Sequence, residues 1–436
     1  MRSLLTVCLS GLVTCAGVPS LCAQPAAPAE ARGYEALKAR AEAFFAEGSF
    51  QKCNEVYAEA SPLELPPADA RWVRFRLADT LWRSQAATET ADDTPYERAR
   101  RELEALAGEV QRPEDRDQVW AEVQESLGDY CWRSPRSRDW QAGWQHYEGA
   151  LEWWGWSADL ATARVRYLAI VRKVVQPPGQ EDWGDYWWYA QVPVNVLDNA
   201  LKVSETPDDI AFAHFVLAMA LRHHSTFAAQ QRVPVEFEGA LQAGKSTAWY
   251  DDALYAYAEW LANRGPAKPA KAGGFTNEPD YVQALGLFRR LTSEFKEGKS
   301  QYWPRARDFS EQITAPNVYV SVGTAFLPDS LIQFDAGWRN VSEVTFNLYQ
   351  VTLIEDADFT NKDAGEHGIT AGGRPKLKTW TRAIEDKGDH RPGRDAITLA
   401  EPLPPGAYMI EIAAAHHSAR ALILVTDATL VLKTSG

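Results

Sequence analysis

The spacing of apolar residues changes once along this chain, near Thr314, and this change restricts the fold more than any other feature of the sequence. Between residues 34 and 313, apolar side chains recur every three or four positions, as on helices with one buried face. After Thr314 they alternate with polar residues in short runs, as on strands with one buried face. We therefore expect several domains in the order α then β: helices over 33–313 and an antiparallel β-sandwich over 314–427.

The helical part contains a degenerate repeat in which small and large apolar residues recur at the offsets of tetratricopeptide helix pairs. One unit begins at Tyr34 and ends near Pro66, and a second contains Leu127-Gly128 and Tyr147. A third covers 254–291 and needs an inserted loop over 265–279. The small residues permit close helix approach, and the large ones fill the neighbouring groove. The repeat predicts an α-solenoid of tetratricopeptide-like helix pairs.

The β part contains short alternating runs separated by turns rich in Pro and Gly. The runs are 318–322, 331–334, 344–351, 396–399, 408–412 and 422–425. The polar stretch 356–394 is interpreted as a long loop that holds one further strand near 378–383. The Ala315-Pro316 step is a natural domain boundary, because the residue before Pro disfavours helix. A last apolar run within 428–436 either closes the sandwich or starts a further domain.

The first residues have the order of a secretory signal: Arg2, then an apolar run, then small residues ahead of Gln24. We interpret 1–23 as a signal peptide and 24–32 as a Pro/Ala linker, and we expect an exported protein, periplasmic or secreted. Lipid attachment at Cys15 or Cys22 is the alternative, and it would place the protein on the outer membrane. The other cysteines, Cys53 and Cys131, are too few for a disulfide framework. We interpret them as core residues, and a single disulfide between them is the alternative.

The charge balance limits the partners. With 45 Lys+Arg against 59 Asp+Glu, the net charge is −14, which argues against nucleic acid as a main partner. The pairs His223-His224 and His416-His417 suggest a metal, but adjacent side chains point to different faces, so we expect no metal site.

Residues 239–246 match the G-x4-G-K-S pattern of a phosphate loop, with Lys245 as the phosphate-binding residue and 233–238 as the strand before it. The surroundings are helical repeats rather than βαβ units, and the interior Ala-Leu-Gln-Ala favours helix. We therefore expect a helix end at Gly244, no nucleotide and no other cofactor. An enzyme stays as an alternative function, and the nucleotide interpretation is part of it.

The chain has 17 Trp, and many lie in two clusters, 153–156 and 183–189. Trp153, Trp154, Trp156, Trp187 and Trp188 are candidates for a surface that stacks sugars or clamps a peptide. In helical repeats such residues also fill grooves between helices, and that interpretation is kept beside the first.

The β part resembles a known family in the order of its short motifs. These are Ile313-Thr-Ala-Pro316, Phe326-Leu-Pro-Asp-Ser330, Trp338-Arg-Asn-Val341, Val344-Thr-Phe-Asn-Leu-Tyr349, Pro405-Gly-Ala-Tyr408 and Leu424-Val-Thr-Asp427. This order is similar to an N-terminal macroglobulin-like domain of the bacterial alpha-2-macroglobulin family. In some members a tetratricopeptide-like region precedes that domain, and 249–255 resembles a helix that recurs there.

The resemblance implies a protein that traps proteinases by means of a cleavable bait segment and, in many members, a Cys-Gly-Glu-Gln thioester. Neither Cys53 nor Cys131 is followed by Gly-Glu-Gln, and no bait segment can be placed. It therefore implies the N-terminal portion of an exported endopeptidase inhibitor that is not an enzyme and contacts proteinases or envelope proteins. The alternative is a stand-alone periplasmic scaffold that binds proteins on the concave face of its repeats and inhibits nothing.

Overall fold

The computed structural model describes residues 29–86, 94–133, 139–156, 160–175, 192–323, 325–352 and 373–427. Helices come first and strands follow, so the predicted order α then β is confirmed. The last helix, α14 (Trp303–Thr314), ends where the apolar period changes, and β3 (Asn317–Val322) begins just after it. The chain forms two compact units, one up to Ala163 and one from Arg164 onward. The expected signal peptide 1–23 and the final run 428–436 lie outside the described residues.

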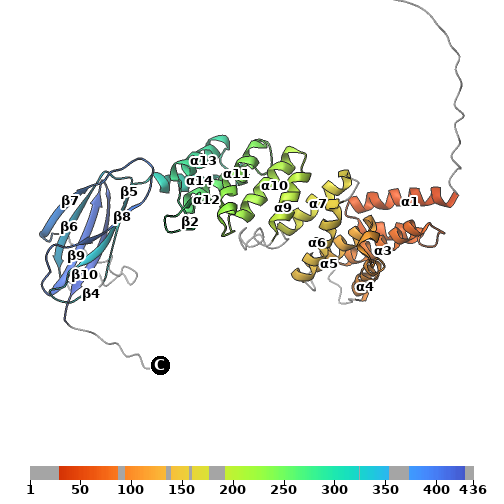
Figure 1. Ribbon diagram of the computed structural model, residues 1–436, viewed down its shortest axis with the longest axis horizontal. Helices are drawn as coiled ribbons and strands as arrows, with labels where there is room; N and C mark the ends of the chain where they lie inside the picture. Colours follow the sequence, from red (N-terminus) through yellow and green to blue (C-terminus); the bar gives the residue numbers. More distant parts are fainter. Residues whose placement is uncertain are drawn as a thin grey trace, which may run out of the picture. The chain divides into compact units, whose positions relative to one another are not determined.

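The first unit consists of helices that pack mainly on their neighbours in chain order (Figure 1). They are α1 (Ala29–Ala46), α2 (Phe50–Ala60), α3 (Pro67–Ala86), α4 (Thr94–Gly108), the short 3₁₀ helix η1 (Pro113–Asp115), α5 (Gln118–Arg133) and α6 (Trp140–Trp156). Helix α1 begins at Ala29, inside the stretch expected to be a linker, because Ala, Glu and Arg favour helix. Pro67 opens α3 at a position where its missing N–H costs no hydrogen bond.

Helix α3 contributes to two apolar cores. On one side Val73 packs with Tyr34 of α1 and Tyr57 of α2, and on the other Phe75 packs with Leu103 of α4 and Leu127 of α5. Because one helix belongs to both cores, successive helix pairs share a continuous interior.

The expected role of small residues is found between α5 and α6. A Cβ atom added at Gly128 would lie 2.7 Å from the ring of Tyr147, and one at Gly143 would lie 3.2 Å from Trp132. Real Cβ atoms do not come as close as the first of these distances, so the Tyr147 ring requires glycine at position 128. At these two contacts the small residues allow the backbones of α5 and α6 to approach closely.

A buried ionic network also joins the helices of this unit. Arg76 donates to Glu42 of α1 at 2.9 and 2.8 Å. Arg83 donates to Asp79 at 2.7 Å and to Asp129 of α5 at 2.8 Å. Both aspartates are at least 98% buried. Charges buried in this way are tolerated only when they are paired, so the network fixes α3 against α1 and α5.

The second unit contains most of α7 (Leu160–Val175), further paired helices and the β region. Its helices are α9 (Val194–Val203), α10 (Pro207–Leu221), α11 (Phe227–Gln242), α12 (Tyr250–Asn263), α13 (Tyr281–Glu294) and α14. Threonine or aspartate side chains cap three of them, as in α13, where Gln283 N–H donates to Asp280 at 2.9 Å.

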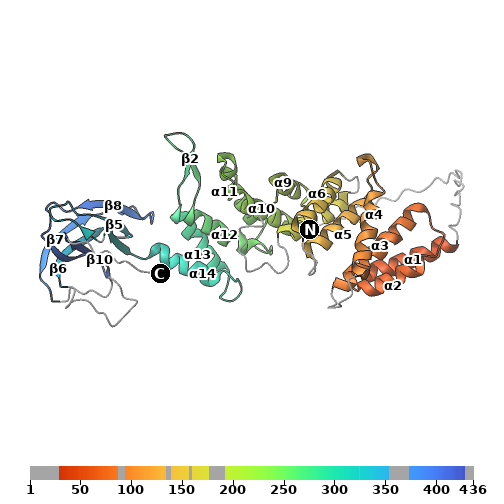
Figure 2. The same cartoon turned by 90° about the horizontal axis from the view of Figure 1, so that it is seen from below.

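The insertion expected over 265–279 is more ordered than a loop. It contains a hairpin of β1 (Ala267–Pro269) and β2 (Phe275–Asn277), which extends away from α12 and α13 (Figure 2). Gln231 of α11 donates to the carbonyl of Ala267 at 2.8 Å. The hairpin is therefore fastened to the neighbouring helix pair.

The β region has two sheets. One has the order β4-β10-β9-β6-β7 and the other β3-β5-β8, and every pairing is antiparallel except that of β4 with β10. The strands after β3 are β4 (Ala325–Phe326), β5 (Gln333–Arg339), β6 (Glu343–Val351), β7 (Lys376–Ala383), β8 (Gly393–Thr398), β9 (Gly406–Ala414) and β10 (His417–Val425). Phe334 of one sheet and Phe346 and Ile410 of the other belong to the same apolar core.

These sheets differ from the sequence prediction in several places, and β10, for example, begins at His417 rather than at 422. Strand β4 was not predicted, because two residues carry no period, and β5 runs on to Arg339 rather than ending at 334. Its second half includes Gly337, which breaks the alternation. A Cβ atom at Gly337 would lie 1.7 Å from the ring of Tyr319 on β3, so the ring covers the glycine and replaces the missing side chain.

The end of α14 is joined to the β region by side chains. Asn340, just after β5, donates to the carbonyls of Ile313 and Ala315 at 2.8 and 2.9 Å. Its Oδ1 atom lies 2.8 Å from Nδ1 of His390. Asn340 has a φ of 54°, in the left-handed region that Asn tolerates better than most residues. The helix-to-strand boundary is therefore a hydrogen-bonded joint within this unit.

Candidate functional site

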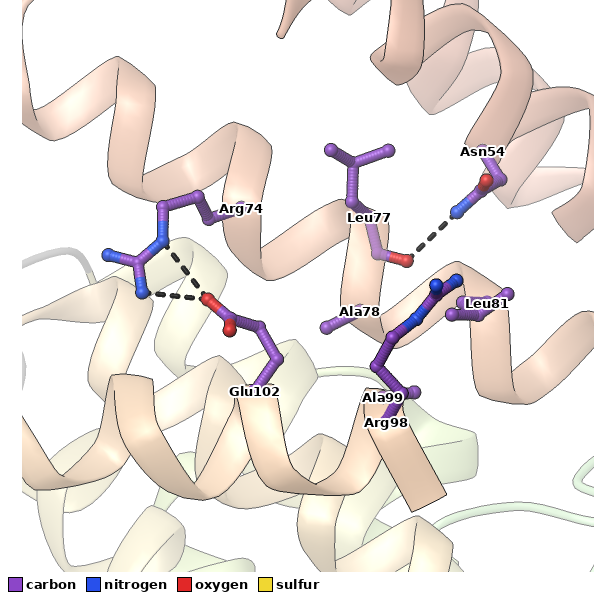
Figure 3. Close-up of a pocket in the computed structure, with 8 residues that line it drawn as sticks. All are labelled: Asn54, Arg74, Leu77, Ala78, Leu81, Arg98, Ala99 and Glu102. Atoms are coloured by element: carbon purple, nitrogen blue, oxygen red, sulfur yellow. Dashed lines mark hydrogen bonds and ion pairs between the residues drawn. The ribbon is translucent and has the colours of Figure 1, made fainter. Parts of the chain in front are cut away.

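The first unit has an open groove of about 320 Å³ between three of its helices (Figure 3). Its lining is Asn54 of α2; Arg74, Leu77, Ala78 and Leu81 of α3; and Arg98, Ala99 and Glu102 of α4. The volume is at the lower end of the range for ligand pockets, so the groove has room for a small group or a short piece of a larger partner.

The floor of the groove is apolar and lies where the two cores of α3 meet. Leu77 packs against the core shared with α1 and α2, and Leu81 against the core shared with α4 and α5. Between them, Ala78 and Ala99 are too short to fill the space, although both are at least 96% buried. The groove is thus a consequence of small residues on facing turns of α3 and α4.

One end of the groove is electrically balanced. Arg74 donates to Glu102 at 2.7 and 3.0 Å and to Glu109 at 2.7 Å (Figure 3 shows the bonds to Glu102). The hydrogen bond with Glu109 is the main reason that the pKa of Arg74 lies above its ordinary value. Glu109 also lies 3.6 Å from Arg71, which donates to Asp117 at 2.6 Å. The Arg74 charge is therefore satisfied within the protein.

The other end carries Arg98, whose side chain extends alongside Leu81 (Figure 3). Arg98 is exposed, and within the described ranges no hydrogen bond or ion pair involves it. Asn54 donates from Nδ2 to the Leu77 carbonyl at 2.8 Å and to Thr80 at 2.9 Å. Its Oδ1 accepts no hydrogen bond from the described part of the chain. This end thus offers a cation and an amide oxygen beside an apolar floor.

The groove was not predicted, and local spacing explains why. Arg98 and Glu102 are four residues apart on α4, a separation at which opposite charges usually pair. The fold instead gives Glu102 to Arg74 of the neighbouring helix, which leaves Arg98 without a carboxylate among the described residues. The sequence shows that Arg98 and Glu102 are four residues apart, but it does not show that Arg74 of another helix competes with Arg98 for Glu102.

The predicted aromatic residues do not gather in this groove. Trp154 is buried and donates to Glu125 at 2.7 Å, and Trp153 donates to the carbonyl of Arg116 at 3.1 Å. The rings of Trp153 and Trp154 meet edge to face at 4.8 Å. Trp153 is half-buried, and Trp156 is 87% exposed and presents its ring to solvent. Trp187 and Trp188 lie outside the described residues.

The phosphate-loop match falls on a helix and the turn after it. Gly239 lies in α11, which ends at Gln242, and Gly244 follows with a φ of 131°, as expected for a helix end. The suggested strand 233–238 is also helical, and it belongs to α11. Lys245 forms an ion pair with Glu294 at 3.0 Å. A Gly-rich loop after a strand, which cradles phosphates, is not what these residues form.

Of the histidine pair at 223–224, His223 borders a second cavity, of about 170 Å³, whose arginines are bonded within the protein. It is lined by Arg222, His223, Glu259, Trp260, Asn263 and Arg264. Arg222 lies 3.7 Å from Glu259, and Arg264 donates to the Arg222 carbonyl at 2.8 Å. Burial, together with the two arginines, lowers the pKa of His223 to about 4. Across the described ranges, no group of three His, Cys, Asp or Glu residues is arranged to hold a metal.

The two cysteines outside the expected signal are free thiols. Cys53 is buried and Cys131 is half-buried. Burial raises the pKa of Cys53 to about 12 and that of Cys131 to about 11. Because the thiolate is the nucleophile, neither is an activated cysteine at neutral pH.

No protein-family model and no curated protein matches this chain.

In the part of the chain that the structure describes, no helix is both long and apolar enough to cross a lipid bilayer.

Proposed function

We propose that this chain is a non-catalytic, protein-binding part of an exported macroglobulin-like endopeptidase inhibitor and forms its N-terminal portion. The observation that carries the proposal is the order of the fold: paired helices joined by a hydrogen-bonded joint to a two-sheet β region. That order is the one implied by the resemblance to bacterial alpha-2-macroglobulins.

The finer architecture is part of this proposal. The shared cores of α3, the contacts of α3 with α5 and of α10 with α12, and the close packing of Gly128 on Tyr147 support an α-solenoid of tetratricopeptide-like pairs. The common core of the two sheets supports a macroglobulin-like β-sandwich. Large surfaces of this kind suit protein partners, and proteinases or envelope proteins are the partners we propose.

A second candidate function is a stand-alone periplasmic scaffold that binds proteins without inhibiting any. The open groove of the first unit favours it, because the groove lies on the helical region and does not involve the β region. Both candidates require protein binding, and they differ in whether proteinases are among the partners.

Binding of the full chain to a panel of endopeptidases, each blocked at its active site, tests the inhibitor proposal. We expect at least one class to bind reversibly in biolayer interferometry, with a dissociation constant in the micromolar range or below. If the chain binds none of them at tens of micromolar but still binds other envelope proteins, the inhibitor proposal is wrong and the scaffold proposal remains. A matched panel of non-proteolytic proteins of similar size and charge is the control.

A further inference from the structure

We propose that the groove between α2, α3 and α4 binds a peptide segment of a partner protein in which an apolar side chain stands next to a carboxylate. This inference rests on the protein-binding function proposed above and names the ligand of one of its surfaces. It combines an apolar floor, a cation without a carboxylate partner in the described ranges, and an amide oxygen that accepts no hydrogen bond from those same ranges.

The floor selects an apolar side chain. Leu77, Ala78, Leu81 and Ala99 present carbon atoms across a space that the two alanines leave unfilled. Filling it with a leucine-sized group removes apolar surface of both partners from water, which is the main source of affinity in such a groove. The groove is open rather than enclosed, so it can receive a side chain that projects from a longer chain.

The charges select a single carboxylate rather than a polyanion. Arg74 is balanced by Glu102 and Glu109, so Arg98 is the cation left over at the groove. A carboxylate next to the apolar side chain of the peptide can accept two parallel hydrogen bonds from Arg98, the bidentate geometry that guanidinium groups favour. One guanidinium without a carboxylate partner in the described ranges suits one carboxylate, whereas nucleic acid and clustered phosphates need several cations close together.

The amide of Asn54 selects a peptide over a fatty acid, which has no N–H to donate. Its Nδ2 is held by the Leu77 carbonyl and Thr80, which fixes the plane of the side-chain amide. The Oδ1 atom is then a positioned acceptor, and a backbone N–H of an extended peptide is the donor that suits it. The three features together describe a short stretch of peptide.

Fluorescence anisotropy of labelled octapeptides with the full chain tests the proposal. Each peptide is Gly/Ser-based and carries Leu-Glu, Leu-Gln or Gly-Glu at its centre. We expect Leu-Glu to bind best, Leu-Gln to bind about three- to five-fold more weakly because an exposed ion pair is lost, and Gly-Glu to bind about ten-fold more weakly or worse because the apolar anchor is lost.

Variants of the chain locate the site. Arg98→Glu should reverse the preference, so that Leu-Gln binds better than Leu-Glu, and it should not disturb folding because Arg98 is exposed and makes no ion pair with the described residues. Arg101→Glu on the same helix is the control: it makes the same charge change outside the groove lining and should keep the wild-type preference.

The proposal is overturned if no peptide binds better than a Gly/Ser octapeptide, or if Arg98→Glu keeps the preference for Leu-Glu. If endopeptidases still bind in that case, only the identity of the groove ligand is wrong. If instead no endopeptidase binds but the peptide preference is as expected, the inhibitor proposal is wrong and the peptide-binding groove stands.

Discussion

At the scale of single residues, the β region depends on an aromatic ring that covers a glycine. The ring of Tyr319 occupies the position that a side chain at 337 would need, since it lies only 1.7 Å from where a Cβ atom there would be. Gly337→Ala must therefore displace the ring or the strand, and we expect it to lower the free energy of unfolding by about 1–3 kcal/mol.

Gly286 offers the matched control for that change. It lies inside α13 with no atom within 4 Å of an added Cβ, so Gly286→Ala should leave stability unchanged or raise it by up to about 1 kcal/mol. Chemical denaturation followed by tryptophan fluorescence and circular dichroism measures both variants. Equal effects of the two substitutions would mean that the packing of Tyr319 on Gly337 is wrong.

His223 makes the stability of the second unit depend on pH. Burial, with Arg222 and Arg264, lowers its pKa from 6.5 to about 4, so the unfolded chain takes up the proton more readily than the folded chain. The stability that folding keeps by holding His223 neutral is therefore complete above pH 6.5, and it is lost as the pH falls from there toward 4.

The variant His223→Gln should lose less stability than the wild type between pH 6.5 and 4 in thermal melts. A His223→Gln curve that parallels the wild type over this interval would contradict a half-buried histidine that stays neutral in the folded chain.

At the scale of elements, the sequence predicted the features that follow from the spacing of apolar residues. It missed the features that depend on contacts between distant parts of the chain. The helices, the switch at Thr314 and most strands followed from apolar spacing, because spacing decides which face is buried. Strand β4 and the second half of β5 did not, since pairing with β10 and cover by Tyr319 come from distant parts of the chain. The groove was missed for the same reason: Glu102 pairs across helices with Arg74 rather than along its own helix.

The joint between α14 and the β region gives a prediction at this scale. Asn340 holds the carbonyls of Ile313 and Ala315 with its side chain while its own backbone is left-handed. Asn340→Gly removes only the side-chain bonds and should cost about 1–3 kcal/mol. Asn340→Ala also loses these bonds but keeps a Cβ in that conformation, whereas Gly relieves its strain, so the Ala variant should cost about 1 kcal/mol more than the Gly variant.

Hydrogen exchange followed by mass spectrometry is the measurement for the joint. Peptides that cover 313–317 should exchange faster in both Asn340 variants than in the wild type, while peptides from α2 and α3 stay unchanged. The control Asn199→Ala alters an amide on α9, remote from the joint in sequence, and should leave 313–317 protected. Wild-type exchange rates at 313–317 in both Asn340 variants would contradict the joint.

At the scale of the whole molecule, neither the cysteines nor the phosphate-loop match, the sequence features that suggested chemistry, forms a reactive site in the described residues. The two thiols have raised pKa values and the phosphate-loop match is a helix and a turn. The chain is acidic, with a net charge of −14, so its partners are expected to be proteins rather than nucleic acids. The proteinase inhibition that we propose for this chain would then act through reversible contact.

Mixing the full chain with the endopeptidase that it binds best, and examining the mixture under native and denaturing conditions, tests that role. Size-exclusion chromatography under native conditions should show the two proteins eluting together, and a denaturing gel of the same fraction should show them as separate bands. Co-elution that survives denaturation would reveal a covalent trap and contradict the reversible contact proposed for this chain. The absence of co-elution with every endopeptidase tested would contradict the inhibitor itself.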